Sequence, residues 1–183
     1  MQSDFFDRLN NLKNRGCYKG FCQVIKDCRA CKLYLARTNI VIGIGKIPND
    51  IMLIGEAPGA EEDLEGKPFI GRAGKLLTKL LEEKGISRDD IYLSNTINCR
   101  PPQNRNPEED EVLACRKYLL KQVLLVKPKI MILVGSVALK AIFNNIDSTI
   151  SRIRGNFIEV DVPYMKRKLF VVPIFHPSYL LRK

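Results

Sequence analysis

Short apolar runs alternate with amphipathic segments along most of this chain, and that alternation limits its fold more than any other feature. The apolar runs predict buried strands over residues 51–54, 91–94, 129–134 and 169–175, with 156–162 as a candidate edge strand. Helices are expected over 73–84, from Asn106 to about Val126, and over 137–143. Strands that alternate with helices favour a mostly parallel sheet covered on both faces, so we expect a three-layer α/β/α fold.

Local signals set the expected ends of these elements. Gly85 should end the helix over 73–84, whose leucines share one face: Leu76, Leu77, Leu80 and Leu81. Asn106 as the cap, Pro107 in the first turn and Glu109 closing a capping box predict the start of the next helix. The stretch between the first strand and residue 73 is expected to be a long polar loop.

Size and composition indicate one globular domain over residues 1–183. The chain is 45% hydrophobic and contains no internal repeat or flexible linker that would mark a second domain. No apolar stretch approaches the roughly 20 residues that cross a bilayer, and the N-terminus does not resemble a secretory signal. We therefore expect a soluble cytoplasmic protein. A formal net charge of +10, concentrated toward both ends, makes nucleic acid the first partner to consider.

Six cysteines in such a chain favour metal or redox chemistry over disulfides. Cys28 and Cys31 form a C-x2-C pair that can direct two thiolates at one ion or cluster, while Cys99 and Cys115 follow singly. Zinc sites usually contain two close pairs, so this spacing favours an iron–sulfur cluster, with buried thiols as the alternative. Cys17 and Cys22 are interpreted as buried thiols or a disulfide.

In a parallel sheet the ligand site lies beyond the carboxyl ends of the strands. Four loops at those ends carry unusual polar residues: 55–59, 95–99, 135–136 and 176–179. Glu56 presents a carboxylate, the sole histidine is His176, and Asn95 offers the paired donor and acceptor that suit a base edge. Phe69 suits either the core or the face of a planar ligand. Taken singly, each also fits an ordinary turn or core position.

Taken together, these residues strongly resemble the family 4 uracil-DNA glycosylases, the iron–sulfur-containing type of thermophiles and archaea. The resemblance covers residues 28 to 182 and rests on the segments 55–59, 61–63, 66–74, Asn95 with 99–105, and 176–182. It implies a central four-stranded parallel sheet between helical layers, a four-iron four-sulfur (4Fe-4S) cluster, and removal of uracil from DNA.

The resemblance also implies roles for individual positions. The expected cluster ligands are Cys28, Cys31, Cys99 and Cys115; Cys17 and Cys22 fall outside the family pattern. The expected pocket residues are Glu56, Ala57, Glu62, Phe69, Asn95 and His176, with Glu56 and His176 catalytic. Ala57 stands where other families place an Asp or Asn that handles the attacking water. Apart from the resemblance, we expect DNA contacts from Arg100, Arg105, Ser136, Tyr179, Leu180 and Arg182. Tyr179 and Leu180 are the candidates for the wedge that fills the vacated stack, and packing against the last strand is their alternative.

The expected reaction begins with extrusion of a uracil nucleotide from single- or double-stranded DNA. Asn95 would read the base, His176 would stabilise the charge that develops on O2, and Glu62 is the suspected wall against thymine. Glu56 would either stabilise the cationic sugar or hold the water. We expect a prokaryotic monomer, associated with the nucleoid through DNA and with no membrane partner, and a sliding clamp is a candidate partner.

Two other interpretations remain open from the residues alone. One is a non-catalytic nucleic-acid-binding module held together by a four-cysteine metal site. The other is an enzyme acting on free nucleotides, in which the Gly55 loop would bind phosphate. Release of uracil from oligonucleotides distinguishes all three.

Overall fold

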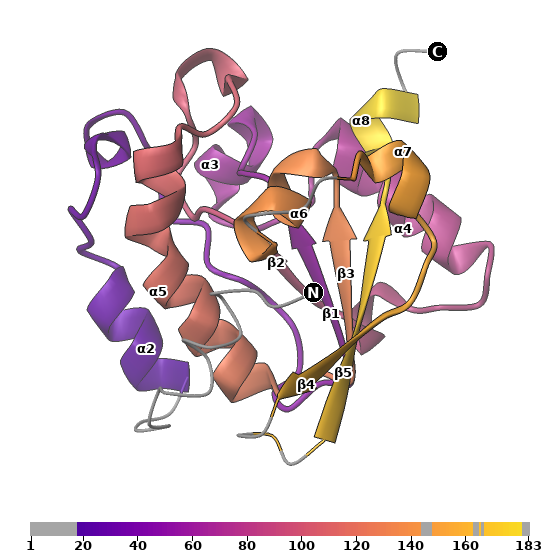
Figure 1. Ribbon diagram of the computed structural model, residues 1–183. Helices are drawn as coiled ribbons and strands as arrows, with labels where there is room; N and C mark the ends of the chain where they lie inside the picture. The colour runs from indigo at the N-terminus through magenta and orange to yellow at the C-terminus, as the bar shows by residue number, and fades with distance from the viewer. Residues whose placement is uncertain (1–17, 144–147, 163–164, 166, 181–183) are drawn as a thin grey trace.

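The computed structural model describes residues 18–143, 148–162, 165 and 167–180, which form a twisted five-stranded sheet between helices (Figure 1). The strand order is β2 (Tyr92–Asn95), β1 (Ile51–Gly55), β3 (Ile130–Val134), β5 (Arg167–Ile174) and β4 (Ile158–Val162). The first four strands are mutually parallel, and β4 pairs antiparallel with β5 at the edge. The four expected parallel strands are confirmed, and the candidate edge strand makes the sheet five-stranded.

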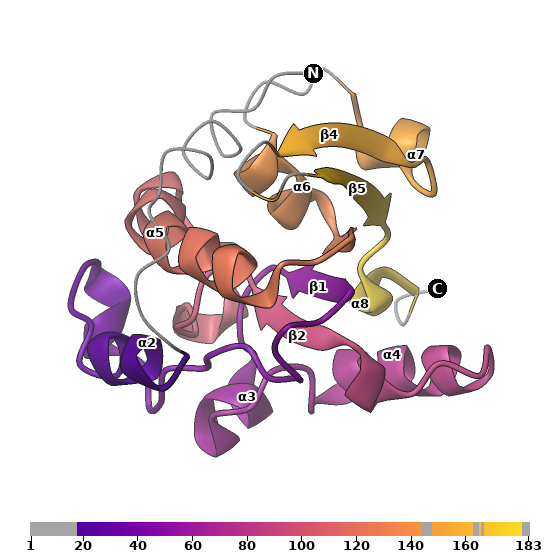
Figure 2. The same cartoon turned by 90° about the horizontal axis from the view of Figure 1, so that it is seen from below.

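Helices cover both faces of the sheet. On one side lie α5 (Glu109–Val126) and α6 (Ser136–Ile142), with α2 (Tyr18–Ile25) packed outside α5; α4 (Arg72–Glu82) and α8 (Pro177–Leu180) lie on the other (Figure 2). The short elements are η1 (Lys32–Leu35), α3 (Ala60–Glu65), η2 (Arg88–Asp90), η3 (Pro102–Asn104) and α7 (Ile150–Ile153). Within the described residues, no helix is both long and apolar enough to span a membrane.

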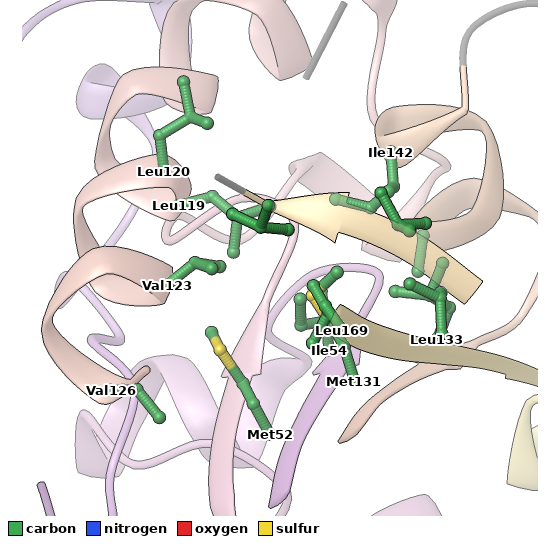
Figure 3. Packing of buried hydrophobic residues seen from close by; sticks show 14 of the residues in the cluster. Met52, Ile54, Leu119, Leu120, Val123, Val126, Met131, Leu133, Ile142 and Leu169 are labelled. Atoms are coloured by element: carbon green, nitrogen blue, oxygen red, sulfur yellow. The ribbon is translucent and has the colours of Figure 1, made fainter. Parts of the chain in front are cut away.

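The core of the described residues contains three clusters, and two of them lie on opposite sides of the sheet because apolar side chains point alternately to its two faces. Met52 and Ile54 on β1 pack with Val123 of α5, Ile142 of α6 and their neighbours in the larger cluster (Figure 3). On the opposite face, Leu53, Leu93 and Val134 pack with Leu77 of α4 and with Phe69. The second cluster thus joins the sheet directly to a segment that was assigned to the candidate site.

Three sequence predictions about helices were wrong, and they concern a start, a missed helix and a buried face. Helix α5 begins at Glu109 rather than at Pro107, because Glu111, not Glu109, accepts the backbone N–H of the cap residue, Glu108, at 2.8 Å. The expected polar loop contains α3, which begins after Gly59 and ends at Gly66 with a left-handed φ of 68°. Leu80 is 40% exposed, because the buried face of α4 centres on Leu77 and Leu80 lies at its flank.

Candidate active site

The carboxyl ends of the four parallel strands surround one cleft of about 470 Å³. All six proposed pocket residues and two of the proposed DNA contacts line it, and they come from separate parts of the chain: Glu56, Ala57, Glu62, Phe69, Asn95, Arg105, Ser136 and His176. The sheet explains this convergence, since parallel strands bring their carboxyl ends to the same edge. Arg100 and Tyr179 are not among the residues that line the cleft.

Gly55 forms the point where the amide of Asn95 and the ring of Phe69 meet. The register pairs Gly55 on β1 with Asn95 on β2. A Cβ atom at Gly55 would lie 2.5 Å from Oδ1 of Asn95 and 2.5 Å from Cζ of Phe69. Asn95 is only 4% exposed and Phe69 only 6%. A hydrogen-bonding amide and a flat ring therefore face the same small space, with no side chain between them.

His176 follows β5 and packs against the turn that follows β3. Gly135 adopts a φ of 91°, and a Cβ atom there would lie 3.2 Å from Cβ of His176. Nδ1 of His176 lies 2.7 Å from Oγ of Ser178 and accepts the backbone N–H of Ser178 at 3.2 Å. Because an N–H can only donate, Nδ1 is the acceptor, and the neutral ring carries its hydrogen on Nε2.

Glu62 joins two segments at the cleft by accepting hydrogen bonds from their backbone N–H groups. One carboxylate oxygen accepts the N–H of Gly59 at 3.1 Å, and the other accepts those of Ile70 at 3.1 Å and Gly71 at 2.8 Å. Three backbone donors thus converge on one side chain. Sequence reasoning placed Glu62 in the pocket but missed these contacts, since no local pattern links residue 62 to residues 70 and 71.

The rim of the cleft contains a bidentate ion pair. Both terminal nitrogens of Arg105 bind the carboxylate of Glu111, at 2.8 and 2.6 Å, and Glu111 is fully buried. The guanidinium of Arg105 holds the pKa of the Glu111 carboxyl below its ordinary value. This ion pair therefore holds the Arg105 side chain in a fixed position at the rim of the cleft. The sequence did not indicate the pair.

The remaining proposed DNA contacts lie near the cleft or outside the described residues. Arg100 donates through Nε to Oδ1 of Asn104 at 2.7 Å, and Asn104 lines the cleft. Tyr179 is 46% exposed, and its ring packs 5.0 Å from that of Phe175. Leu180 is the last residue of α8, its side chain lies outside the described part, and so does Arg182.

The four proposed ligand cysteines surround a separate small cavity between η1, the segment after β2 and α5: Cys28, Cys31, Cys99 and Cys115. Arg37 donates to Sγ of Cys99 at 3.2 Å and to the carbonyl of Cys28 at 2.7 Å. The side-chain nitrogen and oxygen of Asn98, which also lines this cavity, are buried without a hydrogen-bond partner among the described residues.

Burial shifts the pKa of three of these thiols. It raises the pKa of Cys115 to about 12 and also raises the pKa of Cys31 and of Cys99. Across the described ranges, no group of three His, Cys, Asp or Glu side chains is arranged to hold a single metal ion. The arrangement is that of four thiols around one cavity. Cys22 is a free thiol on α2, and its suggested partner Cys17 lies outside the described residues.

Comparison with known proteins places this chain in a family. Residues 42–183 match the model of the uracil DNA glycosylase superfamily. The type-4 uracil-DNA glycosylase of Thermotoga maritima is 46% identical over 86% of this chain and 80% of its own length. Those of Archaeoglobus fulgidus and Saccharolobus solfataricus are 42% and 44% identical, each over 86% of this chain and over 79% and 74% of their own lengths.

The match covers most of this chain and most of each relative. The strand ends also bring the motif residues together in one cleft. These two observations assign the chain to a family. The protein belongs to the uracil DNA glycosylase superfamily, among the type-4 enzymes.

Proposed function

We propose that this protein is a DNA-repair hydrolase that removes uracil from DNA and leaves an abasic site. Its type-4 relatives carry the name uracil-DNA glycosylase. The observation that carries the proposal is the meeting of Asn95, Phe69 and His176 in a single cleft. In the overall reaction water adds to C1′ of the sugar, the bond from C1′ to N1 breaks, and the departing uracil takes up a proton.

Asn95 supplies the selectivity for uracil over cytosine. Its amide accepts the N3–H of uracil and donates to O4, while cytosine presents the opposite polarity at both atoms. Asn95 is almost fully buried, so a mismatched base would leave polar groups unpaired, which costs roughly 10⁴-fold in rate or affinity. Phe69 provides the face on which the extruded base stacks, since its ring borders the same space.

His176 stabilises the leaving group. Negative charge develops on uracil O2 as the glycosidic bond stretches, and a donor placed there is strongest in the transition state. Acceptance of the Ser178 N–H by Nδ1 supports a neutral ring that donates through Nε2. The protein can then stabilise the anion without first protonating the histidine.

Glu56 acts on the sugar side of the cleft. It follows β1 directly and lines the cleft beside Ala57. A carboxylate there either stabilises the cationic sugar or orients the water. The side chain of Ala57 has no polar group to bind water, and we assign this part of the reaction to the carboxylate of Glu56.

Binding to DNA draws on the positive charge of the chain and on the rim of the cleft. The net charge of +10 attracts the phosphate backbone. Arg105 and Ser136 at the rim, with Arg100 beside them, would meet phosphates on either side of the extruded nucleotide. Tyr179, half-exposed on α8, and Leu180 would enter the gap that the base leaves. We further propose action as a monomer on chromosomal DNA; a sliding clamp remains a candidate partner.

The four thiols fit an iron–sulfur cluster, and we propose that Cys28, Cys31, Cys99 and Cys115 hold one of the 4Fe-4S type. The raised pKa values of Cys31, Cys99 and Cys115 favour the protonated thiols, whereas bound iron would hold them as thiolates. The Asn98 amide, which has no hydrogen-bond partner within the described part of the chain, and the N–H that Arg37 directs at Cys99 would then face a charged cluster. Bound, the cluster would join the N-terminal segment to α5; it supplies no step of the reaction.

Two measurements test these proposals separately. Uracil release from single-stranded and duplex oligonucleotides tests the activity; a protein that binds DNA but releases no base would be a binding module, and one active only on free nucleotides would have a different substrate. Iron, sulfide and zinc analysis of purified protein tests the cofactor, and a colourless protein with one zinc would overturn the cluster.

A further inference from the structure

Phe69 has a backbone conformation that its surroundings must impose. Its φ is 55°, in the left-handed region that bulky L-residues rarely adopt. Such a conformation persists only where neighbouring groups over-determine it. The contacts that hold residues 68 to 71 therefore decide where the Phe69 ring lies in the cleft.

Arg88 and Glu62 hold this loop from opposite ends of its peptide groups. The two terminal nitrogens of Arg88 donate to the carbonyls of Phe69 at 2.6 Å and Pro68 at 2.7 Å. Glu62 accepts the following N–H groups, those of Ile70 and Gly71. The carbonyl oxygens of Pro68 and Phe69 thus contact a cation, and the two N–H groups that follow Phe69 in the chain contact an anion.

Neighbouring residues fix Arg88 in turn. Its Nη1 also donates to Oγ1 of Thr78 on α4 at 3.0 Å. The arginine lines an outer hollow with Lys79 and Glu82, and it is not among the residues that line the cleft. Arg88 therefore contacts the loop from behind and does not reach a base that stacks on the other side.

We propose that Arg88 is the positioning residue that sets the Phe69 ring for stacking on the extruded uracil, an inference that rests on the proposed function. The planar guanidinium is suited to this task because its fork reaches two successive carbonyls at once. A lysine at this position keeps the charge and has three donors on a single nitrogen, but it lacks the planar fork that places a separate nitrogen at each carbonyl. Arg88 thus acts on the reaction only through Phe69.

The test compares single-turnover uracil excision in four proteins: wild type, Arg88→Met, Arg88→Lys and the control Lys79→Met. Lys79 is exposed and lines the same outer hollow, so its replacement removes the same charge from the same place. We expect Arg88→Met to slow excision about 10- to 100-fold, the effect of a modest misplacement of a substrate-positioning group. Arg88→Lys should be intermediate, and Lys79→Met should match wild type.

A double-mutant cycle with Phe69→Leu identifies the route by which Arg88 acts. If Arg88 works through the ring, Arg88→Met should cost less than about 3-fold once the ring is gone, and the two effects are not additive. A full additive loss would overturn the inference, because Arg88 would then act elsewhere. Thermal unfolding of every variant accompanies the rates, and if Arg88→Met does not fold, the cycle is run with Arg88→Lys.

Failure of this inference and failure of the proposed function give different results. Wild-type protein that releases no uracil would overturn the function before any variant is compared. Active wild type with an equally active Arg88→Met would overturn only the role of Arg88. Excision restored to Arg88→Ala by added guanidinium, with no such gain in Phe69→Leu, would support the positioning role independently.

Discussion

Ser178 donates its backbone N–H to Nδ1 of His176 over 3.2 Å, so the histidine is oriented by a residue of its own turn. The tautomer of His176 depends on a main-chain N–H that every substitution at position 178 except proline retains. The hydroxyl of the same serine, 2.7 Å from Nδ1, adds a second contact.

His176→Ala should keep DNA binding and lose about 10²- to 10³-fold in single-turnover excision, because it removes a donor that acts in the transition state. Ser178→Ala should lose far less, since the backbone donor to Nδ1 remains. Binding is measured by fluorescence anisotropy with a uracil-containing oligonucleotide. An unchanged excision rate in His176→Ala would contradict the assigned role.

Asn95→Asp should lose most uracil excision, by about 10³-fold or more, because a carboxylate cannot donate to O4. The same change supplies an acceptor for the amino group of cytosine, so the ratio of cytosine to uracil excision should rise. Asn104→Asp is the matched control; it lines the cleft and retains the oxygen that Arg100 binds. An unaltered base preference in Asn95→Asp would rule out base recognition by this amide.

Glu111→Gln should change how stability depends on pH. The folded-state pKa of Glu111 lies below the ordinary value of 4.5, so its contribution is present above pH 4.5 and is lost as pH falls through the folded value. At neutral pH the variant should be less stable by about 1 to 3 kcal/mol. The difference should shrink on acidification below pH 4.5.

Urea unfolding at several pH values measures this effect. Glu109→Gln, an exposed position in the first turn of the same helix, is the control and should follow wild type throughout. A gap between wild type and Glu111→Gln that stays constant down to pH 3 would mean that the Arg105 pair does not depress this carboxyl.

Cys115→Ser should abolish bound iron and the broad visible absorption that we expect of the wild type, because one of four ligands is lost. Cys22→Ser, which changes a cysteine outside the proposed ligand set, should retain both. The measurements are the iron content and the visible spectrum of proteins purified without oxygen. Equal iron in both variants would remove Cys115 from the ligand set.

The main parts of the fold and cleft could be predicted because they depend on local patterns. Apolar runs gave the four parallel strands, and their carboxyl ends brought Glu56, Asn95 and His176 to one edge. Phe69 was harder to assign, since it is at once a core residue and part of the cleft lining.

What the sequence did not reveal depends on contacts between distant segments. Arg88 binds the carbonyls of residues 19 and 20 positions earlier, and nothing about an arginine after a surface turn indicates such partners. The start of α5 was misplaced for a related reason. Several acidic residues near this point could cap the helix. In the structure Glu111 accepts the N–H of Glu108, and the same carboxylate forms the ion pair with Arg105.

Helix α5 carries Glu111 in its first turn and Cys115 one turn later. The same helix therefore reaches both the rim of the cleft, through the Glu111 pair, and the cavity lined by the four cysteines. Any shift of α5 along its axis would move Arg105 together with Glu111, because the bidentate ion pair joins the two side chains. A displacement of α5 at the cysteine-lined cavity would therefore also displace Arg105, the rim side chain that we propose to meet DNA.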